Sequence, residues 1–141
     1  MDKEHEQLYI SNIKDAININ KEEFNRIITV CQDSIEDNVP EDIYSYYKMS
    51  DGDDSYGGDC SYNLFRLASD ELVQSLEDGD TILIHCHMGQ SRSVTVSIAA
   101  LSVYEDIDYH ESRGMVKDNA SPIYPNDLLI EHCKRYIKEN R

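Results

Sequence analysis

The stretch that most restricts how this chain can fold runs from residue 81 to residue 104. It opens with a short apolar run, Thr81–Cys86, which has the length and composition of a buried strand. Five loop residues follow, and then Arg92–Tyr104 is apolar nearly all round, as expected of a helix in the centre of a domain. The order of strand, loop and central helix predicts a layered α/β structure.

The other segments continue this alternation. Three have strand character: Leu8–Ile10, Ile27–Cys31 and Ile43–Met49. Helices are predicted within residues 12–18, over Leu64–Leu76, from near Tyr109, and from near Pro125, with Pro in its first turn. The longest loop is Ser50–Asp59. With 141 residues, about one domain's worth, the chain is predicted to be a single domain, 1–141, with a central, mostly parallel sheet flanked by helices.

The charge balance excludes several classes of partner. Asp and Glu number 28 against 13 Lys and Arg, for a formal net charge of −15, so attraction to nucleic acid or to an anionic membrane is unfavourable. The acids are spread along the chain, which indicates an acidic surface rather than an acidic tail. Because salt screens such self-repulsion, we expect a salt-rich cytosol of the halophilic type; the alternative is an ordinary acidic protein.

The sequence also predicts a cytoplasmic protein. No apolar run approaches the roughly 20 residues of a membrane span, and the charged start, Met1–Glu6, lacks the features of a secretory signal. The four cysteines form no C-x-x-C pair and are expected to be reduced: Cys31, Cys60, Cys86 and Cys133. Only Cys86 lies in a local sequence pattern that indicates a catalytic role.

Cys86 ends the buried strand, and Arg92 opens the helix after the five-residue loop. A loop of this length can wrap its backbone N–H groups around one phosphate-sized anion, and the helix N-terminus adds free donors and the positive end of its dipole. The same donors favour the thiolate form of Cys86. Arg92 can bind two phosphoryl oxygens with its planar fork, and Gly89 lets the backbone turn toward the anion. These residues predict a nucleophilic phosphate site.

The run His85–Ser93, of the form H-C-x-x-G-x-S-R-S, resembles the dual-specificity branch of the cysteine-dependent protein tyrosine phosphatase superfamily. Leu8–Asn12, Ile27–Val30 and Pro125–Asn126 resemble further family elements. The resemblance implies a phosphatase-type fold and a phosphocysteine intermediate on Cys86. It also implies that Ser93 stabilises the leaving thiolate, and that no metal or organic cofactor takes part. Phosphate recognition is assigned to Arg92 and the loop, residues His87, Met88, Gly89, Gln90 and Ser91.

The family also uses an Asp from a separate loop as general acid, and here two candidates compete. The run Met49–Gly52 has the family's apolar-x-Asp-Gly form, which favours Asp51. Counting from Tyr46 and Met49 in the spacing of small dual-specificity enzymes gives Asp53 instead. Neighbouring carboxylates, Asp54 included, would raise one another's proton affinity. We expect Asp51 to be the acid and keep Asp53 as the alternative.

The two histidines beside Cys86 could suggest zinc, but alternate residues of a strand point to opposite faces and no second ligand cluster exists in the sequence. His85 is expected instead to orient the loop from beneath. The ten tyrosines stay without an assigned role.

The resulting hypothesis is a phosphatase for phosphotyrosine, and for phosphoserine and phosphothreonine, in proteins. The resemblance implies a shallow, permissive site, because so short a chain has no room for the amino-terminal region that deepens the pocket of tyrosine-only relatives. The expected partner is a phosphorylated protein, with no nucleic acid and no membrane, and a monomer is expected. The alternatives are a phosphatase for a non-protein phosphate ester, a phosphate-binding module without catalysis, and a sulfur-transfer enzyme.

Overall fold

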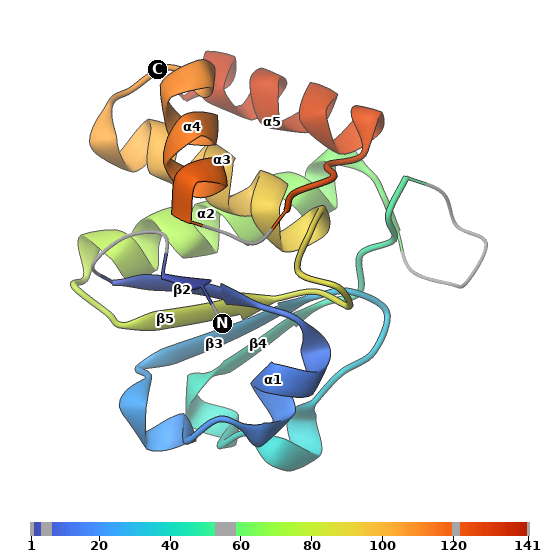
Figure 1. Cartoon of the computed structure of the whole chain (residues 1–141), viewed down its shortest axis with the longest axis vertical. Coiled ribbons are helices and arrows are strands. Elements are labelled where there is room, and N and C mark those ends of the chain that lie inside the picture. The colour runs from blue at the N-terminus through green and yellow to red at the C-terminus, as the bar shows by residue number, and fades with distance from the viewer. Residues whose placement is uncertain (1, 4–6, 53–58, 120–121, 141) are drawn as a thin grey trace.

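The computed structural model describes residues 2–3, 7–52, 59–119 and 122–140, and it contains a five-stranded sheet in the order β1-β2-β5-β3-β4 (Figure 1). β1 pairs antiparallel with β2, and every other neighbouring pair is parallel. The strands are β1 (Asp2–Lys3), β2 (Leu8–Ser11), β3 (Arg26–Val30), β4 (Tyr44–Tyr47) and β5 (Ile82–His85). The two strands beside β5 therefore carry their carboxyl ends to the same edge as β5.

Helices cover both faces of the sheet. The helices α2 to α5 lie over one face, and the short α1 lies under the other (Figure 1). The helices are α1 (Ile13–Asn18), α2 (Tyr62–Glu77), α3 (Arg92–Glu105), α4 (Tyr109–Asn119) and α5 (Asp127–Glu139). Three 3₁₀ turns complete the described elements: η1 (Lys21–Glu23), η2 (Glu36–Asn38) and η3 (Glu41–Ile43). The prediction of an α/β fold with a mostly parallel, helix-flanked sheet is confirmed.

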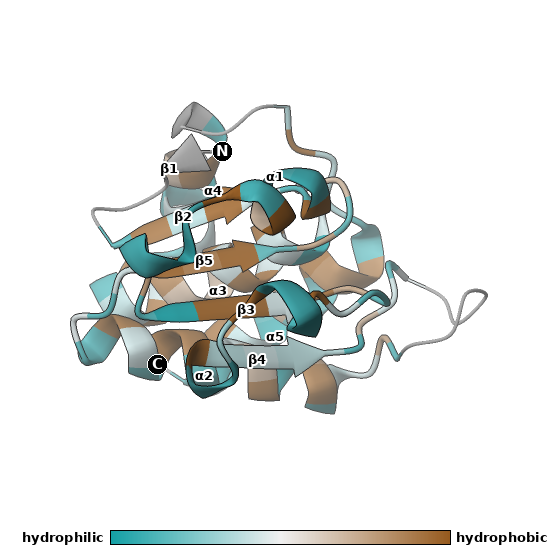
Figure 2. Ribbon diagram, turned by 90° about the horizontal axis from the view of Figure 1, so that it is seen from below, coloured by the Kyte–Doolittle hydropathy of each residue, from teal (hydrophilic) through white to brown (hydrophobic). Residues whose placement is uncertain are grey.

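Side-chain alternation along the central strands builds one core on each face. Ile28 and Ile84 pack into the larger core under α2 to α5, whereas their neighbours Ile27 and Leu83 pack into the smaller core on the α1 side. All four are 0% exposed, and burying such a side chain stabilises the fold by roughly 1.5–3 kcal/mol. Brown, hydrophobic ribbon follows β2, β5 and β3 in Figure 2, while the edge strand β4 is paler.

The helix that follows Cys86 occupies the centre of the helical layer. α3 packs against α2, α4 and α5, and its residues from Arg92 to Ser102 are buried. Its buried hydroxyls include Thr95, which donates to the Ser91 carbonyl, so this polar group is satisfied inside the core. A rigid, buried helix of this kind fixes the position of the loop before it. Within the part of the chain that the structure describes, no helix is long and apolar enough to cross a membrane.

Two boundaries differ from the sequence prediction. α5 begins at Asp127, not with Pro125 in its first turn, because the side chain of Asn126 caps the helix by accepting a hydrogen bond from the Leu128 N–H (2.9 Å). The strand predicted over residues 43–49 is shorter, because Ile43 ends η3 and the ladder with β3 stops at Tyr47.

Candidate active site

The loop between β5 and α3 turns back on itself above the sheet edge. Gly89 has φ +73°, and a Cβ placed there would lie 3.0 Å from the backbone carbonyl carbon and oxygen of Ser11, which ends β2. Any side chain would therefore meet both backbone strain and a backbone collision. The Ile13 N–H donates to the His87 carbonyl (3.1 Å), which fastens the loop to the start of α1. The close approach of the backbone at the end of β2 explains why Gly is needed at this position.

The Cys86 thiol lies at the centre of this loop. It is 1% exposed, and its Sγ accepts a hydrogen bond from the Gly89 N–H (3.3 Å). The Ser93 Oγ, from the first turn of α3, lies 3.2 Å from the same sulfur. The N-terminus of α3 faces the loop, so its dipole and free N–H groups favour negative charge here. The arrangement provides hydrogen bonds and a dipole that stabilise a thiolate.

Arg92 reaches the site from the first residue of α3 and is 8% exposed. Its Nη1 donates to the Met49 carbonyl (3.0 Å) and to Oε1 of Gln32. Its buried Nε has no hydrogen-bond partner among the described residues. A buried guanidinium N–H without an acceptor is costly, so this edge of the fork is suited to an anionic oxygen from a ligand.

Asp51 is held against the loop by two residues from other segments. The Ser91 hydroxyl donates to Asp51 Oδ1 (2.7 Å) and accepts a hydrogen bond from the Asn126 N–H (2.9 Å). The Asn126 Nδ2 donates to the Asp51 carbonyl (3.3 Å). The Pro125–Asn126 element thus connects the start of α5 to the loop that carries Asp51. The alternative acid, Asp53, and its neighbour Asp54 lie outside the described residues.

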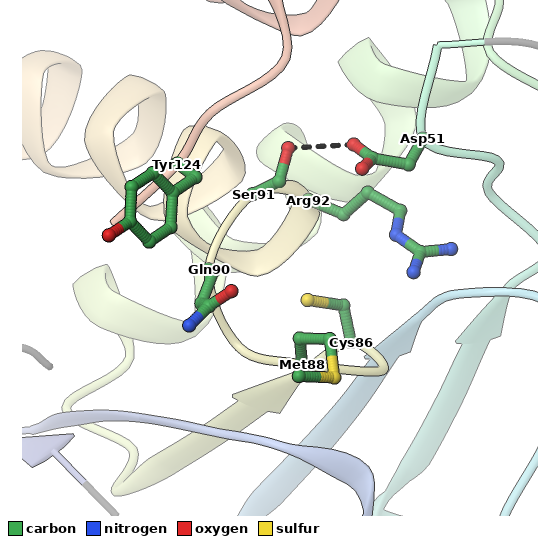
Figure 3. Close-up of a pocket in the computed structure, with 7 residues that line it drawn as sticks. All are labelled: Asp51, Cys86, Met88, Gln90, Ser91, Arg92 and Tyr124. Carbon is green, nitrogen blue, oxygen red and sulfur yellow. Dashed lines mark hydrogen bonds between the residues drawn. The ribbon is translucent and has the colours of Figure 1, made fainter. Parts of the chain in front are cut away.

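A cavity of about 200 Å³ opens above the sulfur (Figure 3). This is small beside the roughly 300–1,000 Å³ of sites for drug-sized ligands, so it suits a compact group such as a phosphoryl ester. Its described lining residues are Asp51, Cys86, Met88, Gln90, Ser91, Arg92 and Tyr124. The sequence prediction named all of these except Tyr124, for which it had no local signal beyond the adjacent Pro-Asn pair.

The remaining predicted site residues lie around this cavity rather than in its wall. Ser93 lies beside the Cys86 sulfur, and Gly89 supplies a backbone donor to it. The His87 side chain is half exposed and points to Asp33, with Nε2 3.7 Å from Oδ2. Among the described residues no group of three His, Cys, Asp or Glu side chains could hold a metal ion.

His85 contacts the loop from below, through a buried chain of hydroxyl groups. The Tyr44 hydroxyl donates to Thr29 Oγ1 (2.6 Å), and this Oγ1 lies 2.6 Å from His85 Nε2. The Cys86 carbonyl oxygen lies 3.2 Å from Nδ1 and can only accept, which assigns the ring proton to Nδ1. In a neutral ring Nε2 is then an acceptor, so the Thr29 hydroxyl donates to it. Burial lowers the pKa of His85 to about 4, so the ring is neutral at physiological pH. A neutral ring keeps this hydrogen-bond order fixed.

Comparison with known proteins finds a family that matches nearly the whole chain. The sequence model of the dual specificity phosphatase catalytic domain matches residues 2–138. A Dictyostelium discoideum protein named as a dual specificity protein phosphatase is 36% identical over 78 residues, which cover 51% of this chain and 20% of that protein. The 123R protein of Invertebrate iridescent virus 6, named as a tyrosine phosphatase, is 28% identical over 93% of this chain and 87% of its own length.

The fold also has a solved counterpart. The crystal structure of human DUSP28 superposes with a TM-score of 0.82 and 15% sequence identity, covering 99% of this chain and 96% of that one. At so low a sequence identity the match indicates a shared fold. The chain spans about a fifth of the length of the Dictyostelium protein, so the similarity there is to a part of a longer protein.

Proposed function

The chain belongs to the dual-specificity phosphatase family of cysteine-dependent protein phosphatases, and from that premise we propose that it hydrolyses phosphotyrosine, phosphoserine and phosphothreonine in proteins. One observation carries the proposal. Cys86, the buried Arg92 and Asp51 line one small cavity (Figure 3). The names of the Dictyostelium and viral relatives support a phosphorylated protein as substrate.

In the first step the Cys86 thiolate attacks phosphorus, so that an S–P bond forms while the ester P–O bond breaks. The loop amides and Arg92 bind the phosphoryl oxygens and stabilise the charge that spreads over them in the transition state. Asp51, in its acid form, gives its proton to the departing oxygen. The product alcohol or phenol leaves, and the phosphoryl group stays on the sulfur.

In the second step water attacks the phosphocysteine. Asp51, now a carboxylate, takes a proton from this water, the O–P bond forms and the S–P bond breaks. The Ser93 hydroxyl, 3.2 Å from the sulfur, donates to the thiolate as it leaves. Inorganic phosphate is released and the enzyme returns to its starting state.

Asp51 is our choice of general acid because its contacts orient it. Ser91 binds only one of its carboxyl oxygens, Oδ1, and Ser91 is itself the last residue of the phosphate loop. The Asp51 carboxyl group is therefore linked to the Cys86 sulfur through its hydrogen bond to Ser91 and the short loop between Cys86 and Ser91. Asp53 lies outside the described residues.

Hydrolysis assays test the proposal directly. The wild-type chain should release phosphate from p-nitrophenyl phosphate and from phosphotyrosine and phosphoserine peptides. The same site variants should lower all of these activities. A chain that turns over nucleotides or phosphoinositides but no phosphopeptide would contradict the protein substrate. A chain that binds phosphate and hydrolyses none of these esters would contradict catalysis itself.

The rim of the cavity favours aryl esters among these substrates. Met88 and Tyr124 are 65% and 70% exposed, yet both line the cavity. Tyr124 and Gln90 both border the cavity (Figure 3). The Tyr124 N–H donates to the Gln90 carbonyl (2.8 Å), which fastens this aromatic residue to the phosphate loop. An aromatic pair adds about 0.5–1.5 kcal/mol beyond area burial, so Tyr124 can bind the ring of phosphotyrosine.

Replacing Tyr124 by Ala should therefore lower kcat/KM for a phosphotyrosine peptide by about fivefold, the equivalent of roughly 1 kcal/mol. The same change should leave kcat/KM for a phosphoserine peptide within about twofold, because no ring is present to stack. Steady-state kinetics on the two peptides measures the ratio. Tyr124→Phe is the matched control and should keep the wild-type ratio; equal losses on both peptides would contradict the aryl contact.

We propose a cytoplasmic location and a single catalytic domain spanning residues 1–141. The four cysteines are buried and free of disulfides, which suits a reducing compartment. The family match over residues 2–138 supports the extent of the domain.

Salt should stabilise the fold, because a net charge of −15 repels itself at low ionic strength. Circular dichroism melts in dilute buffer and in about 1 M KCl should differ in Tm by at least about 5 °C, which corresponds to roughly 1.5 kcal/mol for a domain of this size. Sucrose, which is excluded from the surface without screening charge, is the control. A melt that KCl leaves unchanged would remove the halophilic interpretation.

A further inference from the structure

The segment that follows β3 forms a second wall beside the phosphate loop. Because β3 pairs in parallel with β5, with Thr29 opposite His85, the residues after each strand emerge side by side. Gln32 contacts Arg92 through Oε1, and the adjacent Asp33 contacts His87. The Tyr46 hydroxyl, from β4, donates to the Gln32 backbone carbonyl (2.5 Å) and holds this segment in place.

Gln32 is a side chain that contacts the guanidinium of Arg92. Both described acceptors of Arg92 Nη1, the Gln32 amide oxygen and the Met49 carbonyl, are electrically neutral. No carboxylate of the described residues forms an ion pair with Arg92, although the chain has 28 acidic residues against 13 basic ones. A Glu here could hold the same nitrogen, but its charge would compete with a phosphoryl group for the guanidinium.

We infer that Gln32 is a positioning residue, which fixes the Arg92 guanidinium through Nη1, leaves Nε free for a phosphoryl oxygen, and does so without neutralising the positive charge. The inference extends the proposed function, since it concerns the same phosphate site. A neutral acceptor provides both an oriented guanidinium and its full charge toward a dianion, whereas a carboxylate would provide the orientation and reduce the charge. Gln32→Ala tests the orientation, and Gln32→Glu tests the charge.

Titration calorimetry with inorganic phosphate measures the effect on binding. Gln32→Ala removes the acceptor and should weaken phosphate binding about tenfold, the value of one hydrogen bond to a charged group. Gln32→Glu keeps an acceptor but adds a competing charge, and should weaken binding by about 10- to 100-fold. Gln74→Glu on the exposed face of α2 is the matched control for one added negative charge and should change binding by less than about twofold.

The pH dependence of alkylation by iodoacetamide distinguishes positioning from a merely structural role. Gln32→Glu places a carboxylate against Arg92 and should move the alkylation profile of Cys86 to higher pH, because the guanidinium then stabilises the thiolate less. Gln32→Ala leaves the charge in place and should keep the wild-type profile. A packing defect alone predicts no such difference between the two variants.

The inference is overturned if Gln32→Ala and Gln32→Glu bind phosphate as tightly as Gln74→Glu does, or if their alkylation profiles coincide. Should either Gln32 variant fail to fold by circular dichroism, Tyr46→Phe decides. This change releases the Gln32 backbone and should weaken phosphate binding; unchanged affinity overturns the inference. Neither readout requires turnover. If the variants show the expected changes in phosphate binding while the wild-type chain hydrolyses no ester, only the proposed function is contradicted.

Discussion

Replacing Cys86 by serine should reduce the turnover of p-nitrophenyl phosphate by about 10⁵-fold or more, the scale on which enzymes lose rate when the atom that forms the covalent intermediate is removed. The contacts around Cys86 stabilise a thiolate, but they cannot ionise an alcohol at neutral pH. The Cys86 sulfur accepts from the Gly89 N–H and faces Ser93, and a serine hydroxyl can take the same partners, so the loop should keep its shape. The variant should therefore bind phosphate while failing to react.

Two measurements check this result. Rapid quenching with a radiolabelled phosphopeptide should trap a phosphoryl group on the wild-type chain and none on the Cys86→Ser chain. Cys133→Ser, which changes a buried thiol on α5 away from the cavity, controls for the loss of a buried sulfur and should retain activity. Substantial turnover by the Cys86→Ser chain would exclude a phosphocysteine and with it the mechanism given above.

Replacing Asp51 by asparagine should lower kcat on a phosphoserine or phosphotyrosine peptide by about 10²- to 10³-fold, with KM nearly unchanged. The amide oxygen of Asn can accept the Ser91 hydrogen bond in place of Oδ1, so geometry is retained and only the transferable proton is lost. The loss should be smaller on p-nitrophenyl phosphate, because its phenolate leaves without protonation.

Asp53→Asn is the matched control for this assignment, since it removes one carboxylate from the same loop. It should leave kcat within about threefold, a factor that corresponds to well under 1 kcal/mol of barrier. If Asp53→Asn reproduces the selective loss of kcat and Asp51→Asn does not, Asp53 is the acid. The alternative that the sequence left open would then be the correct one.

The central strand, the loop and the central helix were predictable because each depends on local sequence. The apolar residues Ile82–Ile84 specify a strand that is buried on both faces, and the apolar circumference of residues 92–104 specifies a buried helix. Cys86, Gly89 and Arg92 lie within seven residues of one another, so their relative positions follow from the turn between these two elements. The start of α5 was placed less well, because the pattern could not weigh Pro125 against the capping side chain of Asn126.

Contacts between distant segments had no comparable signal in the amino-acid sequence. Gln32 reaches Arg92 across 60 positions only because β3 lies beside β5 in the sheet. Tyr124 borders the cavity because its backbone bonds to Gln90, and nothing in the spacing of the ten tyrosines separates it from the others. The contacts of Asp51 also depend on the positions of Ser91 and Asn126, which lie far from it in the sequence.

The amino-acid sequence alone thus determined the chemistry of this protein: a thiol and a guanidinium at a fixed short separation, on a strand-loop-helix unit whose apolar residues force it into the core. Only the tertiary structure decided how that chemistry is oriented, which neutral side chain contacts Arg92, which aromatic ring borders the cavity and how Asp51 is tied to the loop. The physical reason is that hydrophobic periodicity and turn residues act within about ten positions, whereas strand order and helix docking bring together residues that no local pattern connects.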